Sequence, residues 1–311
     1  MNLVYCFDSN YNIQAICSIL SILNKINNKV QIYIIHEDPK SFHKEFEIYK
    51  NHENLISYEV FEFKSDSNFP GIKFSHVSNA TYFRLYISTY LPKEVKSAVY
   101  LDPDVICIRD FFDPLTNLIN KLEKSDFIIS ALSTPVNKQM QDTLMKPLMI
   151  DEKYFNAGVM LIDLAKWNKF DLEKQLMDRL NLIKENITYW DQDVLNSFFN
   201  GNYLELPKSM NYMLASTNTT RKYFNEIKRD VFFVHYAGDL KPWTVKGGLF
   251  KTSKFYHDSF LELSLDKYHI INKYKFSTFS YLINGIISLK IFNLKYPFRY
   301  IFQVLKILFN K

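Results

Sequence analysis

Short apolar runs alternate with segments of helical periodicity along most of the chain. Runs rich in β-branched and aromatic side chains are typical of buried strands, and apolar residues that recur every three or four positions indicate helices. Strands are expected at residues 2–7, 30–37, 55–63, 97–101, 126–132, 155–164 and 231–236. Helices are expected at residues 13–23, 81–91 and 178–187. This alternation predicts an α/β fold with a mostly parallel central sheet.

Ligands of such sheets bind beyond the carboxyl ends of the strands, so residues that carry chemistry are expected there. Glycine is scarce, with seven residues in the whole chain. The G-x-G-x-x-G fingerprint of dinucleotide-binding folds does not occur, and neither does the G-x-x-x-x-G-K-[ST] loop.

The distribution of charge sets the C-terminal region apart. The chain has 311 residues, 47% of them hydrophobic, so a sizeable core can be buried. The net charge is +5, but the segment from Lys267 to Lys311 holds eight Lys and Arg and no acid, which leaves −3 for the rest. We therefore expect a main domain at residues 1–249 and an appendage at 250–311 that meets an anionic surface.

The cysteines and the N-terminal residues indicate the cellular compartment of the protein. Cys6, Cys17 and Cys107 are odd in number and lack the close spacing of a zinc or redox motif, so a reduced cytoplasm is the simplest expectation. The first residues have no basic or long apolar region, and no signal peptide is expected. No run reaches about 18 apolar residues, so no spanning helix is expected.

Two aspartates follow the apolar run at residues 97–101. Asp102 and Asp104 alternate in an extended chain and point to the same side, and Pro103 between them disfavours the α conformation at Asp102. Two carboxylates on one side repel each other unless a cation lies between them, and a hard divalent metal would resolve that repulsion. A solvated turn or a helix cap is the alternative for these two residues.

A second group of residues ends the run at 231–236. His235 could supply a nitrogen ligand to a metal, Gly238 would let the backbone approach a phosphate, and Lys241 would give that phosphate a positive charge. The alternative is a core histidine beside a surface lysine.

Two further stretches are polar at the ends of predicted elements. In F-N-A-G-V, Asn156 stands at the mouth of a strand, and the small Ala157 and Gly158 could leave room for a bulky polar ligand or simply allow close packing. In D-Q-D, Asp191, Gln192 and Asp193 could grip sugar hydroxyls or favour the N-terminal dipole of a helix.

The joint order of these four motifs resembles glycosyltransferase family 8 over residues 1 to about 245. That family consists of retaining, nucleotide-sugar-dependent enzymes and includes bacterial lipopolysaccharide galactosyl- and glucosyltransferases and glycogenin. The resemblance implies a GT-A-type nucleotide-sugar-binding catalytic domain at residues 1–249. It also implies a metal site of Asp102, Asp104 and His235, with Mn²⁺ favoured by the mixed oxygen and nitrogen ligands and Mg²⁺ as the other candidate.

The resemblance also implies roles in donor binding. The segment Y-C-F-D-S-N-Y resembles the family's uridine site, with the backbone of Cys6, Asp8 on uracil N3–H, Asn10 on the nucleotide and Tyr11 stacked on the base, although a D-S-N turn could simply cap a helix. Donor contacts are further expected from a set spread along the chain: Arg84, Asp102, Asn156, Ala157, Asp191, Gln192, Gly238 and Lys241.

Retention of configuration needs an explanation in this chain. Gln192 is a poor nucleophile, yet it matches the family position nearest the anomeric carbon, with Asp191 beside it as the other candidate catalytic residue. A front-face mechanism through an oxocarbenium-like state is therefore favoured over a covalent intermediate. Ser133 departs from the family, because it stands where relatives often carry an acid near the acceptor.

The last predicted helix combines basic and apolar residues. Arg299, Gln303, Lys306 and Asn310 fall on one helical stripe, and most of the remaining residues from 297 to 311 are apolar. An interfacial membrane anchor is favoured, and a core helix with snorkelling lysines is the alternative. Membrane attachment would suit a lipid-linked acceptor.

The expected protein is a cytoplasmic hexosyltransferase, peripheral on the inner face of the cytoplasmic membrane. It would move glucose or galactose from a UDP-sugar to a saccharide in lipopolysaccharide or another bacterial surface glycan, without a nucleic-acid partner. The alternatives are a metal-dependent phosphohydrolase and a non-catalytic nucleotide-sugar-binding protein. F-N-A-G-V and D-Q-D have no explanation in a hydrolase.

Overall fold

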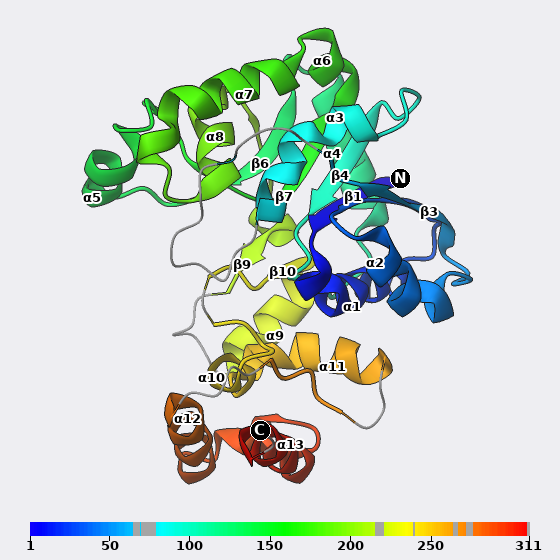
Figure 1. Ribbon diagram of the computed structural model, residues 1–311, viewed down its shortest axis with the longest axis vertical. Helices are drawn as coiled ribbons and strands as arrows, with labels where there is room; N and C mark the ends of the chain where they lie inside the picture. The colour runs from blue at the N-terminus through cyan, green and yellow to red at the C-terminus, as the bar shows by residue number, and fades with distance from the viewer. Residues whose placement is uncertain are drawn as a thin grey trace. The chain divides into compact units, whose positions relative to one another are not determined.

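The computed structural model describes residues 1–64, 69, 79–214, 221–238, 240–263, 267–271 and 276–309. The chain divides by its contacts into two units (Figure 1). Unit 1 comprises Met1–Ile16, Ile26–Pro103 and Phe111–Asn211, and unit 2 comprises Cys17–Lys25, Asp104–Asp110 and Tyr212–Lys311. The predicted division after residue 249 remains a prediction.

Unit 1 contains a sheet of seven strands in the order β3-β2-β1-β4-β7-β6-β8. The strands are β1 Asn2–Phe7, β2 Val30–His36, β3 Leu55–Glu62, β4 Ser97–Leu101, β6 Ile129–Ser133, β7 Phe155–Asp163 and β8 Leu204–Glu205. All neighbouring pairs are parallel except those of β7, which runs antiparallel to both β4 and β6. The predicted α/β class and the mostly parallel sheet are confirmed.

Both faces of the central strands are buried. In β1, Val4 and Cys6 belong to a large apolar cluster, while the alternating Leu3, Tyr5 and Phe7 are buried outside that cluster. Continuous apolar strands of this kind are characteristic of parallel sheets covered by helices on both sides. Polar side chains therefore have room only where the strands end.

The helices of unit 1 include two corrections to the expected elements, one of them the helix expected at 178–187, which runs from Leu172 to Ile183. They are α1 Asn12–Leu23, which continues into unit 2, α2 Pro39–Phe46, α3 Ile87–Tyr90, α4 Phe112–Glu123, α5 Lys138–Met140, α6 Leu164–Lys169, α7 Leu172–Ile183 and α8 Trp190–Phe199. The helix expected at 81–91 is mostly a 3₁₀ helix, η3, at Asn79–Tyr86. In a 3₁₀ helix residues i and i+3 stand directly above one another, and η3 places Thr81 and Arg84 in that relation.

Unit 2 contains a small sheet and several helices (Figure 1). Its strands are β5 Val105–Cys107, β9 Tyr212–Met213 and β10 Phe233–His235, and its helices beyond α1 are α9 Arg221–Asp230, α10 Val245–Gly248, α11 Lys254–Leu263, α12 Phe276–Ile287 and α13 Pro297–Phe309. An apolar cluster joins α10–α13 through Val245, Leu261, Leu282, Tyr300 and Val304. Helix α13 lies at the residues where the sequence predicts the last helix.

Candidate active site

Polar residues stand in a row at one edge of the unit 1 sheet. Asp8 follows β1, Asp102 follows β4, Asn156 lies at the start of the antiparallel β7, and Ser133 ends β6. Since β1, β4, β7 and β6 are consecutive neighbours, the four residues follow one another along the edge. This is the edge at which parallel sheets bind ligands, as the sequence predicts.

Arg84 joins the D-x-D segment to the D-Q-D segment. Its guanidinium lies 2.9 Å from Asp102 Oδ1 and 2.6 Å from Asp191 Oδ2, and Nη1 donates to the Ala157 carbonyl at 2.7 Å. Thr81, one 3₁₀ turn before Arg84 in η3, donates to the other oxygen of Asp191. The 3₁₀ helix thus aims two side chains at one carboxylate.

The Arg84 network is buried, and burial controls its charges. Burial raises the pKa of the Asp191 carboxyl to about 6, and the nearby Arg84 charge and the Thr81 hydroxyl partly oppose that rise. Burial on its own would lower the pKa of Arg84, but Asp102 and Asp191 reverse this and raise it, so the arginine stays charged. Asp191 is therefore an ionised partner of Arg84 at neutral pH.

Both ends of the Gln192 carboxamide are held. Gln192 Oε1 accepts from Asn156 Nδ2 at 3.2 Å and from the Ala157 amide at 3.1 Å, and Nε2 donates to the Tyr154 hydroxyl at 3.0 Å. Tyr154 in turn donates to Asp193, which also accepts from the amides of residues 188 and 189. The predicted sugar-site residues Asn156, Ala157, Asp191 and Gln192 are therefore brought together.

The N-terminal segment forms the turn that the sequence offered as the alternative. Asp8 is buried and accepts the Asn10 amide at 3.0 Å, which caps a short 3₁₀ helix, η1, at Ser9–Tyr11. Asn10 is exposed and Tyr11 is partly exposed, while Cys6 is buried in β1. Capping and base recognition are compatible, because the cap uses one carboxylate oxygen of Asp8.

In unit 2, strand pairing places Asp104 beside His235. The residue after Asp104 begins β5, where Val105 pairs with His235 of β10, and Asp104 Oδ1 lies 3.2 Å from His235 Nε2. Lys241 Nζ lies 2.5 Å from Asp104 Oδ2 and donates to the Tyr236 carbonyl at 2.8 Å. Burial would raise the pKa of Asp104, but the charges of Lys241 and His235 outweigh it and lower that pKa.

The possible ligand atoms of this group suit a divalent cation. Asp104 Oδ1 is buried and lies 3.2 Å from His235 Nε2, so a carboxylate oxygen and an imidazole nitrogen stand side by side as possible metal ligands. Only the buried Pro103 separates Asp104 from Asp102, so the chain itself keeps the second carboxylate close. The three predicted ligands form an Asp-Asp-His group that could hold a metal ion.

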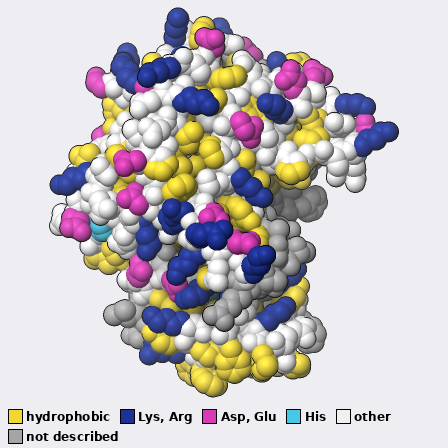
Figure 2. All heavy atoms as spheres, turned by 180° about the vertical axis from the view of Figure 1, so that it is seen from behind, with side chains coloured by type: hydrophobic (Ala, Val, Ile, Leu, Met, Phe, Trp, Pro, Cys, Tyr) yellow, Lys and Arg dark blue, Asp and Glu magenta, His cyan; other side chains and the backbone are white. Residues whose placement is uncertain are grey.

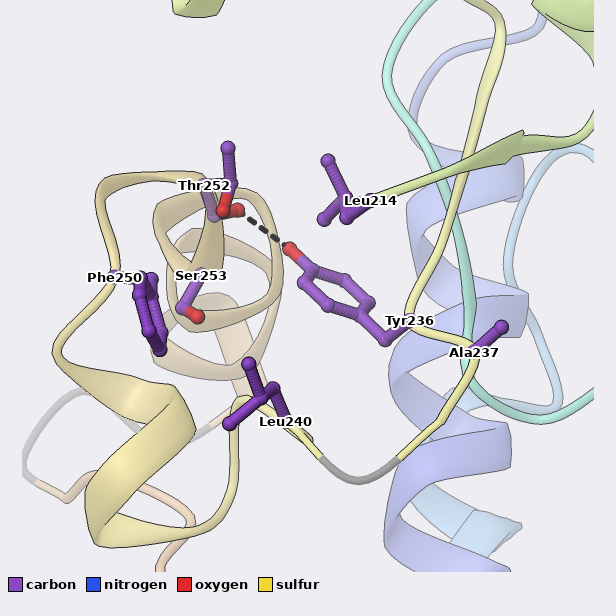
Figure 3. Close-up of a pocket in the computed structure, with 7 residues that line it drawn as sticks. All are labelled: Leu214, Tyr236, Ala237, Leu240, Phe250, Thr252 and Ser253. Carbon is purple, nitrogen blue, oxygen red and sulfur yellow. Dashed lines mark hydrogen bonds between the residues drawn. The ribbon is translucent and has the colours of Figure 1, made fainter. Parts of the chain in front are cut away.

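The loop after His235 is shaped by a glycine. Gly238 is exposed and has a φ of +84°, a conformation that L residues rarely adopt, so glycine is favoured there. Behind the loop lies a small hollow, across which the Tyr236 hydroxyl donates to the Thr252 carbonyl at 2.7 Å (Figure 3). Its lining mixes the apolar Leu214, Leu240 and Phe250 with the polar Thr252 and Ser253.

Several residues at this edge escaped the sequence analysis. Tyr154 and Thr81 hold Gln192 and Asp191, and Asn211 donates to Asn156 Oδ1 at 2.9 Å. The fully buried Asn211 between the apolar Met210 and Tyr212 was a usable signal, because a buried amide needs partners. Thr81 gave no signal in the sequence.

The amino-acid sequence matches one protein family over most of its length. The family described as Glycosyl transferase family 8 matches residues 2–247. The chain belongs to glycosyltransferase family 8. Membership makes it a glycosyltransferase and implies a nucleotide-sugar donor and a saccharide acceptor.

Named bacterial proteins resemble the chain over most of its length. General stress protein A of Bacillus subtilis is 26% identical and covers 78% of this chain and 87% of its own. A lipopolysaccharide 1,2-glucosyltransferase of Escherichia coli K12 is 29% identical, with 82% and 76% covered. A lipopolysaccharide 1,3-galactosyltransferase of Salmonella typhimurium is 25% identical, with 78% and 72% covered.

Solved structures of this family share the fold. Galactosyltransferase LgtC, in complex with donor and acceptor sugar analogs, has a TM-score of 0.67 at 21% identity and covers 90% of this chain and 100% of its own. The glycosyltransferase GlyE of Streptococcus pneumoniae has a TM-score of 0.60 at 20% identity, with 84% and 60% covered. These likenesses confirm the predicted GT-A-type fold of this family 8 member.

Proposed function

We propose that the protein is a retaining hexosyltransferase that moves glucose or galactose from a UDP-sugar to a saccharide of a bacterial surface glycan such as lipopolysaccharide. The observation that carries the proposal is Arg84, which pairs with both Asp102 and Asp191. Arg84 thereby links Asp102, one of the predicted metal ligands, to helix α8, which carries both Asp191 and Gln192. The names of the E. coli and Salmonella relatives support the hexose and the glycan class.

The donor would lie along the row of strand ends. Its uridine would meet the segment from Cys6 to Tyr11, with Asp8 and Asn10 on the base and nucleotide, and its sugar would meet Asn156, Ala157, Asp191 and Gln192. Gly238 and Lys241 would contact the diphosphate, and Lys241 would then exchange its present partner Asp104 for a phosphate oxygen. Arg84 would contribute to donor binding by holding Asp102 and Asp191 in position.

Asp102, Asp104 and His235 would hold the cation, and their mixed oxygen and nitrogen set favours Mn²⁺, with Mg²⁺ as a weaker substitute. When bound, the metal supplies positive charge that stabilises the diphosphate as it leaves. Lys241 adds a second positive charge for the same leaving group, and such charges lower the barrier most when they are already in place.

We expect retention to proceed on the front face of the sugar. The Gln192 carboxamide is a poor nucleophile, and its oxygen already accepts two hydrogen bonds. Its part would be to orient the sugar while a phosphate oxygen of the leaving group takes the acceptor's proton. Intact-mass spectrometry after rapid quench should therefore find no glycosyl adduct, and an adduct on Gln192 or Asp191 would overturn this mechanism.

A panel of nucleotide sugars tests the proposal. With MnCl₂ present, purified protein should release UDP from UDP-glucose or UDP-galactose faster than from GDP- or CMP-sugars, and EDTA should abolish the release. Asp104→Asn should lower the rate by about 100-fold or more, and Asp142→Asn, an exposed partner of Lys146, is the matched control.

Failure to bind any UDP-sugar with Mn²⁺ would refute the function, and binding without turnover would favour a non-catalytic protein. Phosphate release from simple phosphoesters would favour a phosphohydrolase.

We further propose that helices α12 and α13 hold the protein on the inner face of the cytoplasmic membrane, beside a lipid-linked acceptor. No helix in the described ranges is both long and apolar enough to span a bilayer. Large apolar side chains are nevertheless exposed on these helices and the segment between them, and we call this set the apolar patch. Its members are Phe279, Ile283, Ile286, Ile287, Leu289, Phe292, Phe298, Phe302 and Phe309. Figure 2 shows hydrophobic side chains gathered at the lower end of the molecule.

The structure refines the expected stripe of polar residues on α13. Arg299 and Lys306 are exposed, but Gln303 is partly buried and accepts the Tyr268 amide at 2.7 Å. Asn310 lies outside the described residues. One face of α13 is thus in the core through Tyr300, Val304 and Leu308, while aromatic and basic residues face outward, which is the pattern of an interfacial helix.

A further inference from the structure

The row of strand ends continues past Asn156. After β7 the sheet order continues with β6, which ends at Ser133, and then with β8, which ends at Glu205. In the proposed function, the donor sugar nucleotide binds at the part of the row that contains Asp102 and Asn156. Ser133 and Glu205 therefore occupy the far side of the sugar position, where an acceptor has to arrive.

Ser133 fixes the carboxylate of Glu205 with two hydrogen bonds. The Ser133 amide donates to Oε1 at 2.8 Å, and the Ser133 hydroxyl donates to Oε2 at 2.6 Å. The same hydroxyl oxygen lies 2.7 Å from the Tyr203 hydroxyl. Glu205 is solvent-exposed, yet its two oxygens are held in one orientation.

Contacts connect this carboxylate to the proposed sugar site. The Tyr203 ring packs edge-on against Phe155 at 4.8 Å, and Phe155 pairs with Ser133 and directly precedes Asn156. Thr134, next to Ser133, donates to the carbonyl of Tyr154, whose hydroxyl accepts from Gln192. The Ser133–Glu205 pair is thus built into the same strand ends that position Asn156 and Gln192.

From this arrangement we infer that Glu205 binds hydroxyl groups of the acceptor saccharide and helps to determine which saccharide is accepted. This inference rests on the proposed function. A carboxylate offers about four acceptor positions, and Ser133 occupies one on each oxygen. The remaining positions face solvent and suit the hydroxyls of a sugar. Because Ser133 already fixes the carboxylate, little side-chain entropy is lost when a saccharide binds.

Ser133 is a positioning residue in this scheme. The family resemblance implies an acid near the acceptor where this chain has Ser133, and the neighbouring strand supplies a carboxylate at that serine. The alternative is that the Ser133–Glu205 hydrogen bonds serve only stability. Strand β8 has only two residues, and these hydrogen bonds also hold it against β6. The two roles predict different effects of substitution.

The test compares Glu205→Gln with Glu173→Gln. Glu173 is a matched control because it is likewise held by hydroxyl groups, those of Ser88 and Thr89, but it lies on α7. Each protein would be probed on an array of neutral bacterial and host glycans with UDP and MnCl₂ present. UDP-sugar hydrolysis and the melting temperature would be measured in parallel.

We expect wild type and Glu173→Gln to bind the same glycans. Glu205→Gln should bind them about 10- to 100-fold more weakly, with UDP-sugar hydrolysis and melting temperature close to wild type. Ser133→Ala, which keeps the backbone hydrogen bond to Glu205, should give a smaller loss. Unchanged glycan binding by Glu205→Gln would overturn the inference, and so would a wild-type protein that hydrolyses UDP-sugars but binds no glycan. The proposed function would survive both results.

Discussion

At the scale of single residues, the site depends on charges that hold one another. Arg84 and Asp191 are buried and Asp102 is partly buried, and removing one partner from such a group leaves an uncompensated charge, which costs about 3–5 kcal/mol. The sequence identified all three residues as donor contacts. It could not show that Arg84 pairs with both aspartates, because that depends on the 3₁₀ geometry of η3.

Asp191→Asn tests this network. The amide keeps the shape but cannot balance Arg84, so we expect kcat to fall by about 100-fold and the melting temperature to drop. In wild type, activity should decline as the pH falls below about 6, where Asp191 becomes protonated and its pair with Arg84 weakens. A variant with wild-type kcat, or with an unchanged acid limb of its pH profile, would contradict this assignment.

At the scale of elements, apolar patterning predicted strands well and helix type poorly. The runs at 2–7, 30–37, 55–63 and 97–101 became β1–β4 within one residue at each end, because a buried parallel strand is apolar throughout. Residues 81–91 have helical spacing, which cannot distinguish the pitch of a 3₁₀ helix from that of an α-helix over so short a segment. The two-residue strand β8 carries no periodicity, so Glu205 was missed.

In unit 2, two histidines should make stability depend on pH. Burial lowers the pKa of His257 on α11 and of His269 to about 4, whereas an unfolded histidine titrates near 6.5. As the pH falls from about 6.5 towards 4, the unfolded chain gains protons that the folded chain does not, so stability is lost in that window and is fully present above it.

Urea unfolding at pH 7 and pH 5 measures this loss. We expect a decrease of about 2 kcal/mol for each histidine, followed through the tyrosine and tryptophan fluorescence of unit 2. His269→Gln should lower stability at pH 7 through its lost contact with Tyr256, yet it should flatten the pH dependence. Equal stability of wild type at the two pH values would exclude this account.

At the scale of the whole molecule, composition and charge anticipated two regions of different character. The acid-free segment from Lys267 onward contains the helices that carry the apolar patch. The sequence did not indicate that unit 2 also takes in Cys17–Lys25 and Asp104–Asp110, because such long-range contacts leave no local pattern. Cys6, Cys17 and Cys107 are free and buried.

Membrane binding can be tested without disturbing the core. Truncation after Tyr296 would remove the buried Tyr300, Val304 and Leu308, so a cleaner variant changes Phe298, Phe302 and Phe309 to Ser. We expect this variant to lose most sedimentation with anionic vesicles while UDP-sugar hydrolysis persists. Ile48→Ser and Ile56→Ser, at exposed positions of unit 1, are the matched control. Undiminished sedimentation of the triple variant would rule out the patch as the anchor.

The proline between the two aspartates has a thermodynamic consequence. Pro103 is the only residue that separates Asp102 from Asp104, and its ring fixes one backbone dihedral angle in the unfolded as well as the folded chain. Pro103→Ala should therefore lower stability by about 0.4–1 kcal/mol through unfolded-state entropy. It should weaken Mn²⁺ binding in calorimetry through a less favourable entropy, since the free protein would then sample more spacings of the two carboxylates.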